Sequence, residues 1–251
     1  MKLIASLGAL VAAALTAIAG VASAAGAGTT PQPCGAGQHG SPGYAYAGHE
    51  STDVAHGVRA TITPLAEPRV SDGHVAGWIG VGGPGQGRNG EALWLQVGVA
   101  SLPNTPAMVY AEITRGGEAP VFVPLLQDVK VGESHRLAVL ELSGRPNWWR
   151  VWVDGRPAIE PVHLDGPARR WRPIATAESW DGGRPACNSF AFRFDGVEVA
   201  GTGGGSWRQF VPGFRFQDRG FVVQKLAGAP SGRRALATGG PAPYAFRASS
   251  L

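Results

Sequence analysis

Two acids and an amide stand at positions where a strand would place them beside aromatic side chains. Gln96 lies in the run Ala92–Ala100, and Glu112 and Glu178 lie in similar runs further along the chain. A carboxylate in a cleft of low dielectric acquires a raised pKa and can exchange protons with a substrate. An amide NH2 group can donate to a developing oxyanion. Each of these residues alone is more typical of a polar group on the surface, but the three together on Trp-bearing strands indicate acid–base chemistry.

Other chemistries lack the residues that they need. No two of the six His stand at metal-ligand spacing in one element, so we expect neither a metal nor a cofactor, and most of these His at surface or turn positions. The glycine-rich segment Gly80–Gly87 is not followed by a helix, whose N-terminus a phosphate site requires. No G-x-S-x-G nucleophile motif occurs.

The composition predicts that strands position these residues. The chain of 251 residues contains 38 Gly and 20 Pro, which disfavours helices because Gly costs about 1 kcal/mol and Pro about 3 kcal/mol per helix site. With 44% hydrophobic residues and eight Trp, the chain can fill a core, which argues against disorder. Short apolar or alternating runs separated by Gly and Pro turns are typical of a β-sandwich or barrel. The clearest runs are Val58–Pro64, Val75–Val81, Ala92–Ala100, Val109–Thr114, Pro120–Leu126, Arg136–Leu142, Trp148–Val153, Pro173–Trp180, Ser189–Val199 and Gly220–Leu226.

Alternation along these runs separates a core face from a second face. In Ala92–Ala100 the aliphatic side chains point one way, while Trp94 and Gln96 point the other way. A solvent face would carry Lys, Ser and Thr rather than Trp. The second face is therefore interpreted as a concave binding cleft, with a second packing layer as the alternative. Its candidate substrate-binding residues are Trp78, Trp94, Tyr110, Glu112 and Trp180.

A resemblance to a known family rests on these same residues. The motifs are Trp78-Ile79-Gly80, Leu95-Gln96-Val97-Gly98, Tyr110-Ala111-Glu112, Ala177-Glu178 and Phe190-Ala191-Phe192. In this order, and with Glu112 sixteen residues after Gln96, they resemble the core of the glutamic peptidases called eqolisins. The resemblance covers roughly residues 75–199.

The resemblance implies an all-β fold, a two-sheet antiparallel jelly roll of the concanavalin-like type, in a secreted peptidase that acts at acid pH without a metal. Its catalytic dyad would be Gln96 and Glu178. The family carries two Glu four residues apart, of which the second is catalytic. If Glu178 matches the first, Gly182 occupies the catalytic position and the chain is an inactive relative. If the alignment shifts by four residues, Glu178 is the catalytic residue and Ile174 occupies the other position.

Two other functions remain open. Jelly rolls also host glycosidases with two facing carboxylates, a role that Glu112 and Glu178 could fill, and glycan-binding modules that use aromatic platforms. The second of these open functions is that of a secreted sandwich without catalysis.

The N-terminal residues predict export, and the rest of the chain divides into three segments. Lys2, the apolar stretch Leu3–Ala19 and the small residues Ala22-Ser23-Ala24 are typical of a secretory signal over residues 1–24, with a retained membrane anchor as the alternative. We expect a flexible segment over residues 25–43, the sandwich over 44–226 and a disordered tail over 227–251.

The two cysteines and the charge bound the environment and the partners. In an exported protein, Cys34 and Cys187 are expected to form a disulfide. The net charge of +4 is spread without a run of Lys or Arg, so nucleic acid is not an expected partner. We expect a secreted monomer that is free of the membrane once the signal is removed. Its substrate would be a polypeptide or, alternatively, a polysaccharide.

Overall fold

The computed structural model describes residues 43–166, 171–182, 187–227 and 243–250, which belong to one compact unit. The regular elements in these ranges are β-strands, so the predicted all-β class is confirmed. A search of the same ranges found no helix with the length and apolarity needed to cross a membrane. The predicted signal, Cys34 and all but the last residue of the predicted flexible segment lie outside the described residues.

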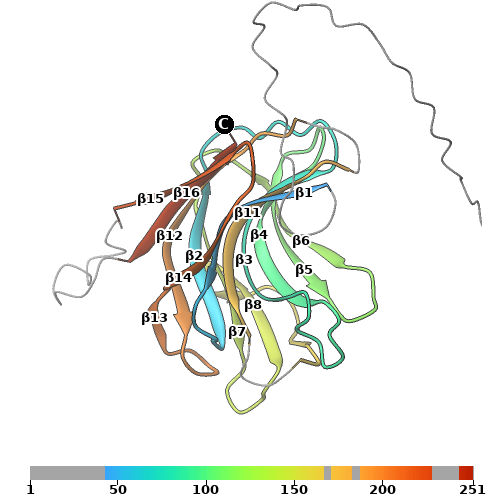
Figure 1. Ribbon diagram of the computed structural model, residues 1–251, viewed down its shortest axis with the longest axis vertical. Helices are drawn as coiled ribbons and strands as arrows, with labels where there is room; N and C mark the ends of the chain where they lie inside the picture. Colours follow the sequence, from blue (N-terminus) through green and yellow to red (C-terminus); the bar gives the residue numbers. More distant parts are fainter. Residues whose placement is uncertain (1–42, 167–170, 183–186, 228–242, 251) are drawn as a thin grey trace, which may run out of the picture. The chain divides into compact units, whose positions relative to one another are not determined.

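One sheet contains seven antiparallel strands in the order β14-β1-β11-β3-β4-β5-β6 (Figure 1). The strands are β1 (Tyr44–Ser51), β3 (His74–Gly83), β4 (Leu93–Ser101), β5 (Ala107–Thr114), β6 (Val121–Val129), β11 (Pro173–Trp180) and β14 (Pro212–Gln217). Three of the six neighbouring pairs (β14-β1, β1-β11 and β11-β3) join strands that are distant in sequence, so this sheet collects side chains from across the chain.

The other sheet contains nine strands. Its path is β10-β8-β7-β2-β12-β16-β15, with β13 paired to β12 and β9 paired to β8. The strands are β2 (Gly57–Pro64), β7 (His135–Glu141), β8 (Trp148–Val153), β9 (Arg156–Pro157), β10 (Val162–His163), β12 (Ala191–Ala200), β13 (Trp207–Gln209), β15 (Phe221–Leu226) and β16 (Tyr244–Ser250).

The core lies between the two sheets, on the faces that alternation predicts. Leu95 on β4 and Ala177 on β11 are fully buried from one side, and Trp149 on β8 is fully buried from the other. Gly77 on β3 shows how closely the sheets approach, because a Cβ at that position would lie 2.6 Å from the ring of Phe192 on β12. The predicted two-sheet sandwich is therefore confirmed, and its core leaves the opposite face of the seven-stranded sheet for the site.

The prediction of a disordered tail is wrong for the C-terminal part of that tail. Residues 228–242 lie outside the described residues, but Tyr244–Ser250 form β16, which pairs with both β12 and β15. The aromatic side chains of β16 enter the core, where Phe246 stacks on Phe194 with ring centroids 4.4 Å apart. Burial of these rings outweighs the low strand propensity of the Gly- and Pro-rich sequence before them.

Candidate active site

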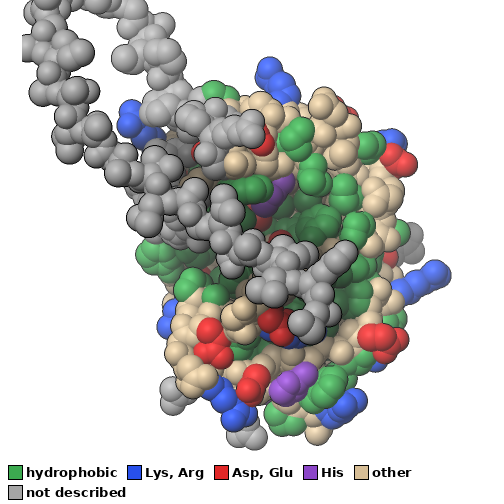
Figure 2. Space-filling model, turned by 90° about the vertical axis from the view of Figure 1, so that its right-hand side faces the viewer, with side chains coloured by type: hydrophobic (Ala, Val, Ile, Leu, Met, Phe, Trp, Pro, Cys, Tyr) green, Lys and Arg blue, Asp and Glu red, His purple; other side chains and the backbone are tan. Residues whose placement is uncertain are grey.

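A cavity of about 420 Å³ opens on the face of the seven-stranded sheet that points away from the core. Figure 2 shows hydrophobic side chains gathered around a hollow on one face of the molecule. The cavity is lined by Tyr44, Tyr46, Trp78, Val81, Gly82, Gly83, Pro84, Trp94, Leu95, Gln96, Glu112, Pro120, Ile174, Thr176, Glu178 and Phe216. The structure thus brings together the predicted Gln96 and Glu178 with Trp78, Trp94 and Glu112.

The side chain of Gln96 on β4 is held by a hydrogen bond to its neighbour Tyr110. The Gln96 side chain is buried, and its Nε2 donates a hydrogen bond of 2.9 Å to the Tyr110 hydroxyl. Tyr110 is 1% exposed and stacks on Phe122 of β6. The structure therefore places Tyr110, a predicted substrate-binding residue, beneath Gln96 rather than in the cavity lining. Because an amide NH2 has two donors, the bond to Tyr110 leaves one N–H for a substrate oxygen.

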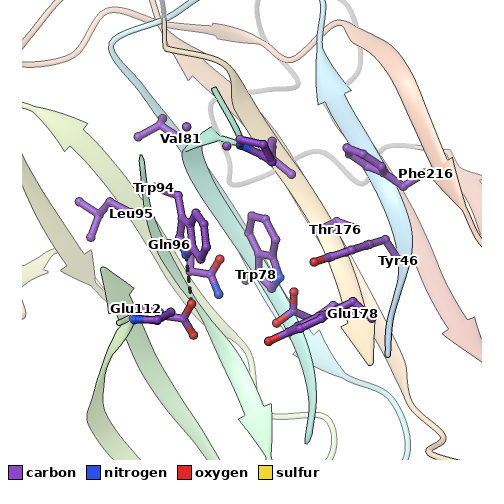
Figure 3. Close-up of a pocket in the computed structure, with 16 residues that line it drawn as sticks. Tyr46, Trp78, Val81, Trp94, Leu95, Gln96, Glu112, Thr176, Glu178 and Phe216 are labelled. Atoms are coloured by element: carbon purple, nitrogen blue, oxygen red, sulfur yellow. Dashed lines mark hydrogen bonds between the residues drawn. The ribbon is translucent and has the colours of Figure 1, made fainter. Parts of the chain in front are cut away.

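Glu112 lies directly opposite Gln96 in the β4–β5 register. Its Oε1 accepts a hydrogen bond of 3.0 Å from Trp94 Nε1, drawn as a dashed line in Figure 3. Burial raises the pKa of Glu112 and the charge of Glu178 raises it further, although the Trp94 hydrogen bond and His74 act in the opposite direction. The net rise favours the protonated carboxyl, as a proton donor requires.

Glu178 reaches the cavity from β11, on the other side of Trp78 from Gln96 (Figure 3). The register places Ile174, by way of Gly80, in line with Gln96 across the sheet, whereas Glu178 is in line with Ala76. Glu178 is therefore four residues further along the same face of β11. A substrate bond held between Gln96 and Glu178 would lie over Trp78.

Trp78 forms the floor between the two candidate catalytic groups. Its cross-strand neighbours are Gly98 on β4 and Thr176 on β11. The side chain is 8% exposed, and among the described residues its Nε1 has no hydrogen-bond partner. A buried N–H without a partner is costly, so this group is suited to donate to an oxygen atom of a substrate or water.

Two side chains from β1 line the cleft beside Glu178. They are not among the site residues predicted from the sequence. Tyr44 and Tyr46 line the cavity. Burial, and then the charge of Glu178, raises the pKa of both tyrosines, so both keep their hydroxyl protons. Alternation with the buried Ala45 and Ala47 would have placed these tyrosines on the cleft face. The predicted Trp180 stacks on Tyr44 at the border of the cavity and is not part of its lining.

The expectation that most histidines are surface or turn residues is wrong for the described ones. His49 and His135 are buried, and His74 lies on the cleft face within 3.1 Å of Glu178. Only His163 among the described histidines is exposed. The described residues hold no group of three or more His, Cys, Asp or Glu arranged to bind a metal ion.

Comparison with known proteins identifies the fold. No protein-family model matches the sequence, and no curated protein matches it. A crystal structure of scytalido-glutamic peptidase with a peptide-based transition-state analogue is similar to this chain, with a TM-score of 0.50 and 14% identity over 82% of this chain and 98% of that one. SCP-B of the eqolisin family, in complex with the tripeptide Ala-Ile-His, has a TM-score of 0.45 at 14% identity over the same shares of the two chains. A Bacillus licheniformis β-glucanase has a TM-score of 0.37 at 15% identity over 57% of this chain and 63% of that one.

The likeness to scytalido-glutamic peptidase supports the jelly-roll fold. At 14% identity the match to scytalido-glutamic peptidase shows a shared architecture and not membership of its family.

Proposed function

We propose that this chain is a hydrolase that cleaves peptide bonds at acid pH, with Glu178 as general base and Gln96 as oxyanion donor. One observation carries the proposal: both residues line one cavity, from the same face of one sheet, on either side of Trp78. The resemblance of the Gln96 and Glu112 motifs to the eqolisins supports it, as does the fold shared with a glutamic peptidase crystallised with a peptide-based analogue.

The proposed reaction needs only groups of the chain and one water molecule. Glu178 takes a proton from water while the water oxygen attacks the carbonyl carbon of the peptide. Gln96 Nε2 donates to the carbonyl oxygen as its negative charge develops. The C–N bond then breaks when Glu178 returns the proton to the amide nitrogen. The largely apolar lining of the cavity suits the side chains of a polypeptide.

Proteolysis assays with matched variants test this proposal. Wild-type protein should cleave casein between about pH 2 and 5, and chelators should not inhibit it. Glu178→Gln should lower kcat by about 10²–10⁴-fold, and Gln96→Ala by about 10²–10³-fold. The exposed residues Glu160 and Gln224 provide controls, since Glu160→Gln and Gln224→Ala should keep full activity. Cleavage that survives both cleft substitutions would refute the assignment.

A second candidate is glycoside hydrolysis by Glu112 and Glu178. The specific observation is that burial and the charge of Glu178 raise the pKa of Glu112. One protonated and one ionised carboxyl in a cleft are the pair that a glycosidase uses. Release of reducing sugar from β-glucans or xylan, lost in both Glu112→Gln and Glu178→Gln, would select this candidate. Binding of glycans without hydrolysis would indicate a binding module instead.

We also propose that the chain is exported, is cleaved after Ala24 and acts as a monomer with a Cys34–Cys187 disulfide. The apolar N-terminal stretch and the paired cysteines support this. Mass analysis of the exported protein should find Ala25 at its N-terminus. A peptide pair joining the two cysteines should disappear on reduction, and detection of free thiols instead would contradict the disulfide.

A further inference from the structure

A histidine that the proposed reaction does not use contacts the proposed general base. His74 begins β3, and its Nε2 lies 3.1 Å from Oε1 of Glu178. The side chain of Glu178 is 6% exposed and that of His74 is 23% exposed. The contact is thus shielded from water at the carboxylate and open to water at the imidazole.

Aromatic side chains fix the orientation of the imidazole. His74, Trp180 and Tyr44 are in line across β3, β11 and β1. The ring centroids of His74 and Trp180 are 5.7 Å apart, and those of His74 and Tyr44 are 6.0 Å apart. These contacts restrict the rotation of the ring, so Nε2 keeps its direction toward Glu178.

The charges around His74 favour its protonated form. The acids that act on it are Glu178 on β11 and Glu112 on β5, and the tyrosine beside it is Tyr44 on β1. No Lys or Arg is among the described residues that line the cavity. Burial alone would lower the pKa of His74, but the hydrogen bond to Glu178 and the charges of Glu178 and Glu112 raise the pKa above its ordinary value.

We infer that His74 is a positioning residue for the general base: it donates from Nε2 to Oε1 of Glu178 and leaves Oε2 to hold the attacking water. This inference rests on the proposed function of Glu178 in hydrolysis. A hydrogen bond from an imidazolium to a carboxylate is roughly twice as strong as a neutral one.

The protonation state of His74 should affect the pH profile of activity. The ion pair exists only while His74 is protonated, and the pKa of His74 is raised. Activity should therefore decline as the pH rises through that pKa, because the carboxylate loses its charged partner.

Two substitutions separate positioning from packing. His74→Phe keeps a ring between Tyr44 and Trp180 but removes the donor, and it should lower kcat about tenfold with KM within about twofold. His74→Asn restores an N–H donor that does not titrate, so it should recover part of kcat and lose the alkaline limb. The exposed His163 provides the control His163→Phe, and thermal unfolding should verify that each variant is folded. A His74→Phe enzyme with the kcat and pH profile of the wild type would overturn the inference.

A titration that does not depend on activity completes the test. The pKa of His74, followed by NMR of the imidazole, should fall when Glu178 is replaced by Gln, whereas the pKa of His163 should not change. An unchanged His74 titration in an active enzyme would overturn the positioning role alone. A wild-type protein without activity on either peptides or glycans would overturn the proposed function, and the positioning role with it.

Discussion

At the scale of single residues, the cleft brings together three buried polar groups, two of which take part in the proposed hydrolysis. Glu178 is a buried carboxyl group in contact with His74, and Gln96 is an amide whose Nε2 donates to the Tyr110 hydroxyl. Trp78 adds a buried N–H that has no partner among the described residues. The first two have a proposed role, and the third calls for a test of its own.

Replacing Trp78 by Phe should separate substrate binding from stability. The change removes the indole N–H and keeps most of the apolar ring, so we expect kcat/KM to fall about tenfold while the free energy of unfolding changes by less than about 1 kcal/mol. Trp152 offers a matched control, because its Nε1 also lacks a partner among the described residues and it lies on β8 of the other sheet. Trp152→Phe should leave kcat/KM unchanged. Equal effects of the two substitutions on activity would contradict a role for the Trp78 N–H.

At the scale of elements, the β3–β4 pair sets the level of the cleft floor. Gly98 on β4 is the cross-strand neighbour of Trp78, and a Cβ there would lie 2.5 Å from Cβ of Trp78 and still closer to the carbonyl oxygen of Gly77. The absence of a side chain at Gly98 lets the Trp78 indole occupy the floor between Gln96 and Glu178.

A methyl group at position 98 should therefore disturb the site through the strand pair. Gly98→Ala should destabilise the fold by about 1–3 kcal/mol and lower kcat by at least tenfold, because β3 and β4 must separate locally. At Gly201 the nearest atom to an added Cβ is 3.5 Å away, so Gly201→Ala should be tolerated. The measurements are urea unfolding and the peptidase assay, and wild-type kcat in Gly98→Ala would show that the close approach is unimportant.

A second element-scale prediction concerns β16. Phe246 is fully buried against Phe194, and its strand lies between β12 and β15. Phe246→Ala should cost about 3–5 kcal/mol in chemical unfolding. Phe214 on β14 is 49% exposed, so Phe214→Ala should cost less than about 1 kcal/mol. Comparable costs at the two positions would contradict a structural role for β16.

At the scale of the whole molecule, an acid-acting enzyme must remain folded where it works, and a buried histidine sets one limit. His49 on β1 points between the sheets, with its ring edge-on to Tyr244 and Phe246 of β16. Burial, and then the positive charge of Arg215, lowers the pKa of His49 from 6.5 to about 4. Between these two pH values the unfolded chain binds more protons than the folded chain at this position, so the free energy of unfolding decreases as the pH falls.

The substitution His49→Phe tests whether His49 limits the stability of the fold in acid. The wild type should lose about 1–2 kcal/mol of stability through His49 between pH 6.5 and pH 4, a figure reduced for partial solvent screening. The variant should lack this component. Urea unfolding at several pH values measures it, with His163→Phe as the control that keeps the wild-type slope. Identical pH dependence in His49→Phe and the wild type would show that His49 does not limit acid stability.

The sequence by itself determined the strands and their two faces. Side chains alternate with period two along any strand, so Ala175 and Ala177 could be assigned to the core, and Thr176 and Glu178 to the cleft, without knowledge of the neighbouring strands. The same local pattern placed Gln96 and Trp94 on the cleft face. The burial of the two alanines and the cavity lining confirm these assignments. They could be made from sequence because they depend only on residues adjacent in the chain.

Only the tertiary structure decided which side chains meet. Trp148 and Trp152 alternate as clearly as the cleft tryptophans, but β8 belongs to the nine-stranded sheet, so they face away from the cavity. The contact between His74 and Glu178 joins residues 104 positions apart. Strand order and register are set by long-range pairing and by burial between the sheets. A local sequence pattern does not report either of these interactions. The cleft face was therefore predictable, whereas the partner of its proposed base was not.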